Sequence, residues 1–130
     1  MFKIKKTFEI SAEHSLRLPY PSKCSRNHGH NFLLTIYCAS DGLDENGMVV
    51  DFTEIKKKIL DILDHRNLNA IEGLGFVGSV PCLFSKAVRR NPTAERIAYW
   101  IYERIEKCYR VDVQESDGNV ATYIDDTVRI

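Results

Sequence analysis

The sequence predicts an α+β domain in which an antiparallel sheet carries two helices on one face. Three observations predict this class: an apolar period of two near the N-terminus, two segments with a helical apolar stripe behind an N-capping signal, and an Asp-Gly turn between two strand-like segments near the C-terminus. Their order is strand, strand, helix, helix, strand, strand (ββααββ), which favours antiparallel pairs with the helices on one side.

The first two strands are expected at residues 2–10 and 31–39. In the first, apolar side chains alternate with polar or charged ones, and the apolar set is Phe2, Ile4, Phe8 and Ile10. The second, "NFLLTIYCA", is rich in β-forming residues and is the expected partner of the first. The segment between them is rich in proline and polar residues and too irregular for a helix or a strand.

Two helices are expected in the middle of the chain. Asp51 and Glu54 fit a capping box for the first, whose apolar face consists of Ile55, Ile59, Ile62 and Leu63. The second opens at "NPTAE", where Asn91 is a good N-cap, Pro92 suits the first turn and Glu95 complements the positive helix end. Its apolar stripe consists of Ala94, Ile97, Ala98, Ile101 and Ile105.

The remaining elements are a hairpin and a long connection. Residues 111–124 are expected to form the hairpin, with Asp117 and Gly118 at its turn. Residues 70–90 are unusually long for a connection between two elements, which indicates a functional or mobile loop.

Length and charge limit the class of protein. At 130 residues, the chain is expected to form one domain over residues 1–130. Lysine plus arginine equals aspartate plus glutamate, at 18 each, so charge gives no case for nucleic acid or an anionic membrane as the main partner. No apolar run approaches the roughly 20 residues of a membrane span, and no signal peptide is evident, so the expected location is the cytoplasm.

The cysteines show no pairing pattern and are expected to be free thiols in a reducing compartment. Cys38 and Cys108 lie in apolar contexts that are typical of packing residues. Cys24 lies among polar residues and turn formers, where a reactive thiol is expected.

Three of the four histidines have a spacing that indicates a metal site. His28 and His30 stand two residues apart at the start of the second strand, so their side chains point to the same face. His14 follows the first strand, the expected neighbour. Three imidazoles with a fourth position open are typical of catalytic zinc, and Gly29 between two of them allows close approach of the backbone. The alternative, that each histidine satisfies a local hydrogen bond, is less favoured for a cluster of this kind.

The pair Asp64 and His65 has two interpretations. A histidine at the end of a helix is favoured by the helix dipole. In the other interpretation, Asp64 and His65 help a thiol to exchange protons, with the carboxylate raising the basicity of the imidazole. The spacing leaves both open.

Six segments in order resemble the 6-pyruvoyltetrahydropterin synthase / 6-carboxytetrahydropterin synthase family. They are "FEISAEHSL", "CSRNHGHN", "GMVVDFTEIK", "LDHRNLN", "NPTAERIA" and "VQES", and together they contain all four histidines. The resemblance covers almost the whole chain. It implies the tunnelling fold, a four-stranded antiparallel sheet with two helices on one side. It also implies trimers whose sheets join into a β-barrel, hexamers of two trimers, and active sites between subunits.

The resemblance also implies roles for individual residues. His14, His28 and His30 would hold Zn²⁺, and Cys24 would be the catalytic thiol, close to the metal but not bound to it. Asp64 and His65 would complete its proton relay from a neighbouring subunit.

Two further residues are expected at the substrate by resemblance alone. Glu115 would clamp the pterin, and Thr93 would contact it. From the pattern alone, Glu115 is a solvated glutamate at a strand end and Thr93 an ordinary first-turn threonine.

The substrate implied by the resemblance is 7,8-dihydroneopterin triphosphate. Three residues separate Cys24 from His28, a short spacing that resembles the bacterial branch, which forms 6-carboxytetrahydropterin, acetaldehyde and triphosphate for queuosine synthesis. The alternatives are a synthase that eliminates triphosphate to form 6-pyruvoyltetrahydropterin, and a zinc-loaded pterin-binding protein without turnover. Residues 75–90 depart from the bacterial pattern and are expected to be an inserted loop.

Overall fold

The computed structural model describes residues 1–75 and 91–128 of the chain. In chain order, the elements are β1 (Phe2–His14), the 3-10 helix η1 (Lys23–Ser25), β2 (His28–Ser40), α1 (Phe52–Leu63), β3 (Arg66–Asn67), the 3-10 helix η2 (Leu68–Ala70), α2 (Ala94–Arg104), β4 (Cys108–Ser116) and β5 (Asn119–Ile124). The strands form one sheet of order β3-β1-β2-β4-β5, antiparallel except for the short parallel pair of β1 and β3. The α+β class is confirmed, whereas the count of four strands is wrong, because β3 adds a fifth to the described sheet.

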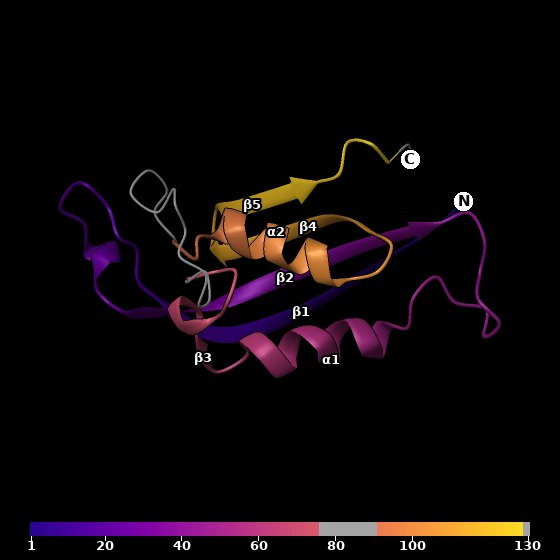
Figure 1. Ribbon diagram of the computed structural model, residues 1–130, viewed down its shortest axis with the longest axis horizontal. Coiled ribbons are helices and arrows are strands. Elements are labelled where there is room, and N and C mark those ends of the chain that lie inside the picture. Colours follow the sequence, from indigo (N-terminus) through magenta and orange to yellow (C-terminus); the bar gives the residue numbers. More distant parts are fainter. Residues whose placement is uncertain (76–90, 129–130) are drawn as a thin grey trace.

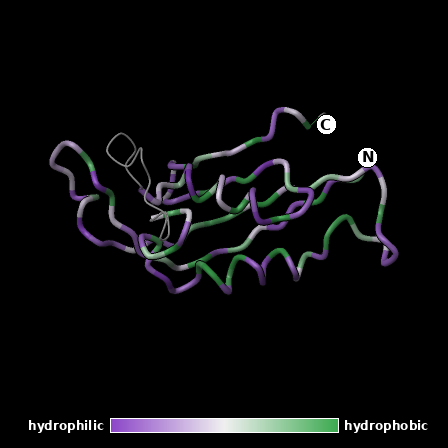
Figure 2. The backbone as a smooth tube through the Cα atoms, in the orientation of Figure 1, coloured by the Kyte–Doolittle hydropathy of each residue, from purple (hydrophilic) through white to green (hydrophobic). Residues whose placement is uncertain are grey.

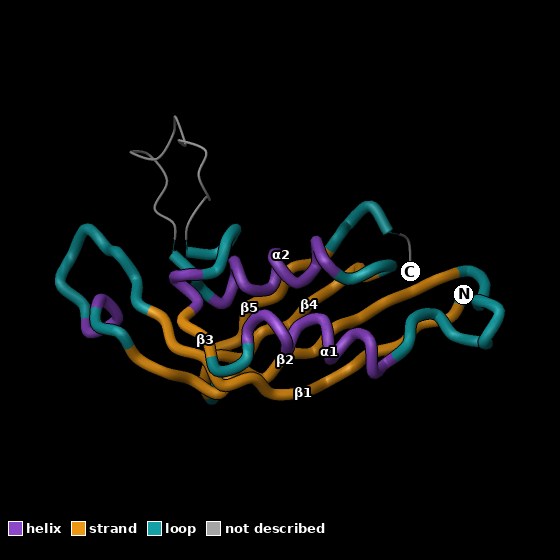
Figure 3. The backbone as a smooth tube through the Cα atoms, turned by 60° about the horizontal axis from the view of Figure 1, so that its bottom comes forward, coloured by secondary structure: helices purple, strands orange, loops and turns teal. Residues whose placement is uncertain are grey.

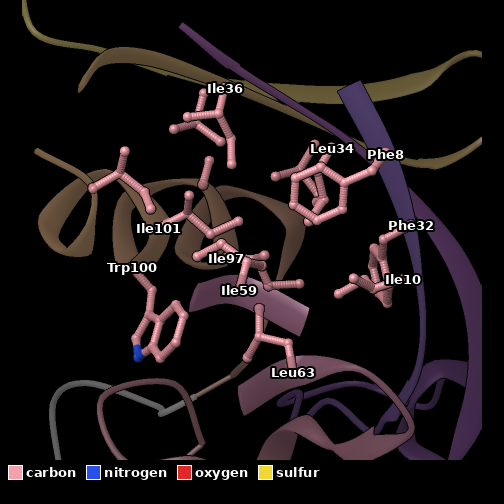
Figure 4. Packing of buried hydrophobic residues seen from close by; sticks show 14 of the residues in the cluster. Phe8, Ile10, Phe32, Leu34, Ile36, Ile59, Leu63, Ile97, Trp100 and Ile101 are labelled. Atoms are coloured by element: carbon pink, nitrogen blue, oxygen red, sulfur yellow. The ribbon is translucent and has the colours of Figure 1, made fainter. Parts of the chain in front are cut away.

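Both helices lie on the same side of the sheet (Figure 3). Side chains from that sheet face and from both helices form one buried cluster, part of which Figure 4 shows. Its fully buried members include Phe32 and Leu34 from β2, Leu63 from α1 and Ile101 from α2. The hydropathy of the chain alternates along α1, as expected for a helix with one face on the core (Figure 2). Among the described residues, no helix combines the length and the apolar character that crossing a membrane requires.

The first two strands are longer than predicted. β1 continues to His14 and β2 begins at His28, so the two are paired over their whole length. The inward alternation of β1 continues past Ile10 through Ala12 and His14, all buried. Alanine and histidine are weak strand signals, so the sequence pattern predicts an end of the first strand that is too early.

The helix ends agree with the predictions only in part. Asp51 caps α1, but its side chain accepts from the backbone N–H of Thr53, not from that of Glu54 as a capping box requires. Thr93, not Asn91, is the N-cap of α2, because its hydroxyl accepts from the backbone N–H of Arg96. Asn91 directly precedes Pro92, which biases it away from the helical region, and its amide is used elsewhere.

Two residues of the predicted apolar faces are not buried residues of their helix. Ile62 is 40% exposed, at the margin of the buried face of α1. Ile105 is buried but follows α2 as its C-cap residue. The hairpin of β4 and β5 turns at Asp117 and Gly118 as predicted, with Gly118 at a positive φ of 80°.

One end of the sheet gathers the candidate site. At the end opposite the chain termini lie the end of β1, the start of β2, the β4–β5 turn and the N-terminus of α2 (Figure 1). The loop predicted at residues 75–90 lies, apart from Gly75, outside the described residues.

Candidate functional site

The pairing of β1 with β2 brings the three predicted metal ligands together. His14 stands directly opposite His28, and His30 follows two residues later on the same face, opposite Ala12. The ring centroids are 4.6 Å apart for His14 and His28, 5.2 Å for His14 and His30, and 4.9 Å for His28 and His30. This face also carries Phe32, so the histidines continue the row of core side chains.

A fourth group lies within reach of the three imidazoles. The Oε1 atom of Glu115 lies 3.2 Å from Nε2 of His14 and 3.4 Å from Nε2 of His30. One donor atom from each of His14, His28, His30 and Glu115 lies within 4.8 Å of the others. The sequence predicted Glu115 as a substrate contact, and the structure places its carboxylate against the histidines.

Two backbone carbonyls orient the imidazole rings. Nδ1 of His14 lies 2.8 Å from the carbonyl oxygen of Pro92, and Nδ1 of His28 lies 2.7 Å from that of Arg26. A carbonyl oxygen only accepts, so Nδ1 donates in both rings, and in the neutral form Nε2 carries a lone pair. This arrangement is typical of histidines that bind a metal through Nε2.

The Nε2 atom of His14 is buried and has no hydrogen-bond partner among the described residues. Glu115 is close, but a carboxylate oxygen and an unprotonated ring nitrogen are both acceptors, so the contact is repulsive unless a cation lies between them. Burial lowers the pKa of His14 from its ordinary value of 6.5, as do His28 and His30, against the opposing effects of the Pro92 carbonyl and Glu115. Protonation of His14 is therefore disfavoured between these groups, and the three imidazoles with Glu115 fit a divalent metal ion.

The lowered pKa of His14 predicts the pH dependence of stability in the metal-free protein. Below pH 6.5 the unfolded chain takes up a proton at His14 that the folded chain resists, so stability is lost as the pH falls through this region. Urea unfolding of chelator-treated protein is expected to show a lower midpoint at pH 5.5 than at pH 7.5. His14→Gln should reduce this difference, and an unchanged difference in that variant would contradict the assignment.

Cys24 lies beside the metal-donor group but outside it. It belongs to η1, where its backbone N–H donates to Oγ of Ser22 at 3.1 Å and its carbonyl accepts from Leu16 at 2.8 Å. A pocket of about 680 Å³ is lined by Lys23, Cys24, Arg26, Asn27, His28, Gly29, His30, Glu115, Ser116 and Asn119. Cys24 therefore shares a pocket with two of the histidines and Glu115.

Asp64 and His65 do not line this pocket in the single chain. His65 lines a second pocket of about 490 Å³ with residues from β1, β2 and β3. Oδ1 of Asp64 accepts from the backbone N–H of Ser11 at 2.8 Å, and its Oδ2 lies 3.5 Å from Nε2 of His65. The His65 side chain is 81% exposed, and its backbone has a positive φ of 58°.

Thr93 and Gly29 lie next to the metal-donor group. Thr93 lies at the N-terminus of α2, where its hydroxyl oxygen already serves as the cap. A Cβ at Gly29 would lie 3.7 Å from the carbonyl oxygen of Ala12, an ordinary contact, so the fold of the single chain does not require glycine there.

The sequence pattern does not single out Asn69, and it predicts Asn91 as a helix cap, which is wrong. Both side chains bind the backbone just beyond His14. The only sequence signal is their place in "LDHRNLN" and "NPT", which does not reveal a partner so far away along the chain.

Comparison with known proteins shows which family the sequence of this chain matches. The model of the family described as 6-pyruvoyl tetrahydropterin synthase matches residues 3–126. A 6-carboxy-5,6,7,8-tetrahydropterin synthase of Synechocystis is 34% identical over 136 residues, covering 95% of this chain and 93% of the relative. A dihydroneopterin monophosphate aldolase of Pyrococcus furiosus is 38% identical over 90 residues, covering 67% of this chain and 62% of the relative.

Solved structures agree with the sequence comparison. The structure of Caenorhabditis elegans 6-pyruvoyl tetrahydropterin synthase aligns with a TM-score of 0.67 and 25% identity, covering 95% of each chain. The resemblance of the six sequence segments is therefore confirmed. The chain belongs to the 6-pyruvoyl tetrahydropterin synthase family.

Proposed function

We propose that the chain is a zinc-dependent enzyme that converts 7,8-dihydroneopterin triphosphate to 6-carboxy-5,6,7,8-tetrahydropterin, acetaldehyde and triphosphate, in the synthesis of queuosine. The observation that carries the proposal is the buried Nε2 of His14, which faces Glu115 without a hydrogen bond beside a pocket that contains Cys24. A metal site and a thiol in one pocket are what this chemistry needs.

In this proposal His14, His28 and His30 hold the zinc ion. When bound, zinc supplies a Lewis acid that lowers the pKa of the hydroxyl groups on the substrate side chain. The Nδ1 contacts to Pro92 and Arg26 keep two of the three rings in the tautomer that leaves Nε2 free.

Cys24 acts as the base that removes a proton from the adjacent carbon and returns it elsewhere. A thiolate bound to the metal could not do this, so the proposal requires a thiol that is close and unligated. Its place on the pocket wall, outside the group of four metal donors, supports this role.

The pterin ring is proposed to bind at Glu115 and Thr93. The Glu115 carboxylate is 29% exposed and lines the pocket, so it can accept from a ring N–H and an exocyclic amino group together. Thr93 uses its oxygen to cap α2, which leaves its O–H free to donate. Lys23 and Arg26 line the same pocket and offer positive charge to the triphosphate.

Asp64 and His65 are proposed to serve the Cys24 of a neighbouring subunit, in a hexamer of two trimers. Their separation from the Cys24 pocket within one chain supports this arrangement. The left-handed backbone at His65 costs about 1–2 kcal/mol for a residue other than glycine, which favours a role for its side chain. The edge strand β5 also exposes Val120 and Ile124, as expected if another subunit covers it.

The product is assigned from two observations. Three residues separate Cys24 from His28, and the Synechocystis relative is named for the carboxy product. The C. elegans relative supports a pyruvoyl product as the second candidate. The relative from P. furiosus supports aldolase chemistry on a monophosphate.

Mass spectrometry of the products tests the proposal. Zinc-loaded protein incubated with 7,8-dihydroneopterin triphosphate is expected to yield 6-carboxytetrahydropterin and acetaldehyde, and chelator-treated protein neither. A pyruvoyl product would overturn the carboxy assignment while keeping the family reaction. Unchanged substrate would overturn the proposal and favour a monophosphate substrate or a binding role.

A further inference from the structure

The backbone that follows β1 is bound by side chains, and not by a strand, along the edge where β1 pairs with β3. Along that edge, Ser11 donates its N–H to Asp64 and accepts from the N–H of His65, and β3 pairs with residues 12–13. Past the end of β3, residues 15–17 have no strand beside them among the described residues. There, two side-chain amides make the hydrogen bonds that a neighbouring strand would make.

Asn69 and Asn91 each bind both backbone groups of one residue. Oδ1 of Asn69 accepts from the N–H of Ser15 at 2.8 Å, and its Nδ2 donates to the carbonyl of Ser15 at 2.9 Å. Oδ1 of Asn91 accepts from the N–H of Arg17 at 2.7 Å, and its Nδ2 donates to the carbonyl of Arg17 at 3.0 Å. The two asparagines therefore bind alternate residues of the segment, Ser15 and Arg17, in the same way.

The same segment also binds the backbone of Cys24. The N–H of Leu16 donates to the carbonyl of Cys24 at 2.8 Å. The backbone of Cys24 is therefore bound to the same three-residue segment that the two asparagines bind.

The same two asparagines are coupled to the metal ligands. Ser15 directly follows His14, whose Nδ1 donates to the carbonyl of Pro92, the residue after Asn91. Asn69 is itself held by its backbone N–H, which donates to Oδ1 of Asn67 at 3.0 Å. A Cβ at Gly75 would collide with the backbone of Asn69, so the chain approaches it closely on that side.

We propose that Asn69 and Asn91 are positioning residues that hold the metal ligand His14 in place through the segment that follows it, a segment that also binds the Cys24 backbone. Their side chains bind the backbone of Ser15 and Arg17, in the segment that directly follows His14 and whose Leu16 N–H binds the Cys24 carbonyl. Neither asparagine belongs to the four-donor group or lines the Cys24 pocket, so both act through other residues. The inference rests on the metal site of the proposed function.

Zinc affinity of the intact chain, measured by competition with a chromogenic chelator, tests the inference. Asn69→Ala and Asn91→Ala are each expected to raise the dissociation constant for zinc about 10- to 100-fold, the range for residues that orient metal ligands. Asn69→Asp and Asn91→Asp keep the size and the acceptor but lose the N–H donor, and the same direction is expected. The aspartate variants can be measured in place of the alanine variants if the alanine variants do not fold.

Two control variants separate positioning from loss of stability. Asn46→Ala removes an exposed asparagine that joins the turn at Asp44 through its backbone N–H, and wild-type affinity is expected. Ile59→Val removes a buried methyl group and is expected to lower the midpoint of thermal unfolding. Wild-type zinc affinity is again expected. A merely structural role would lower the midpoint of the asparagine variants in the same way and leave zinc affinity unchanged.

The outcomes distinguish the inference from the function on which it rests. Wild-type zinc affinity in all the asparagine variants would overturn the inference alone. Failure of the wild-type protein itself to bind zinc would overturn the metal site and the inference together.

Discussion

Replacing Cys24 with alanine is expected to reduce turnover of 7,8-dihydroneopterin triphosphate by about 10²- to 10⁴-fold, the usual contribution of a positioned acid–base group. Zinc should remain bound at the wild-type stoichiometry, because the thiol lies outside the group formed by the three histidines and Glu115. Steady-state kinetics and metal analysis of the same preparation measure both quantities. The fold should be unaffected, since Cys24 is half-buried at the pocket wall in a short 3-10 helix.

Cys38 supplies the matched control for loss of a thiol. It is fully buried opposite Cys108 on β4, and the hydrogen bond with that thiol, together with burial, raises the pKa of Cys38. Cys38→Ala should lower stability and leave turnover per folded molecule unchanged. Loss of zinc from Cys24→Ala would show that the thiol is a fourth ligand, and wild-type turnover would exclude it as the base.

The part of the fold predicted from the sequence is the part carried by repeated local patterns. The strand alternation around Phe8, the stripe around Ile59 and the Asp117-Gly118 turn each repeat or concentrate a signal that needs no distant partner. The sequence pattern could not reveal β3, because two residues are too short to establish a period. Its position depends on β1, which it joins through Ala12 and Glu13.

The candidate site divides in the same way. His28 and His30 were predictable because a spacing of two on a strand directs side chains to one face. The approach of Glu115 to His14 and His30 depends on how β4 is aligned with β2, and no local pattern encodes that register. The amide of Asn91 could not be assigned because a cap and a long-range backbone contact use the same donor and acceptor atoms, and only the fold selects between them.

His14→Ala is expected to lower zinc affinity by more than the roughly 10–100-fold typical of residues outside the ligand set, and to abolish turnover with it. His14 places one of the three imidazole donors, and its side chain is the buried one. The variant also leaves a cavity and removes the donor to the Pro92 carbonyl, so its stability should fall as well. Because folding and metal binding change together, a second ligand is needed to separate them.

His30→Ala provides that separation. Its side chain is 24% exposed, so removing it should cost less stability than the change at His14 while still removing a ligand. His65→Ala is the matched histidine control, because its ring is largely exposed and lies outside the donor group, and zinc should stay bound. Equal zinc affinity in His30→Ala and His65→Ala would contradict the three-histidine site. Loss of zinc in Glu115→Gln as well would mean that Glu115 completes the coordination, and its proposed contact with the pterin would then have to come from another residue.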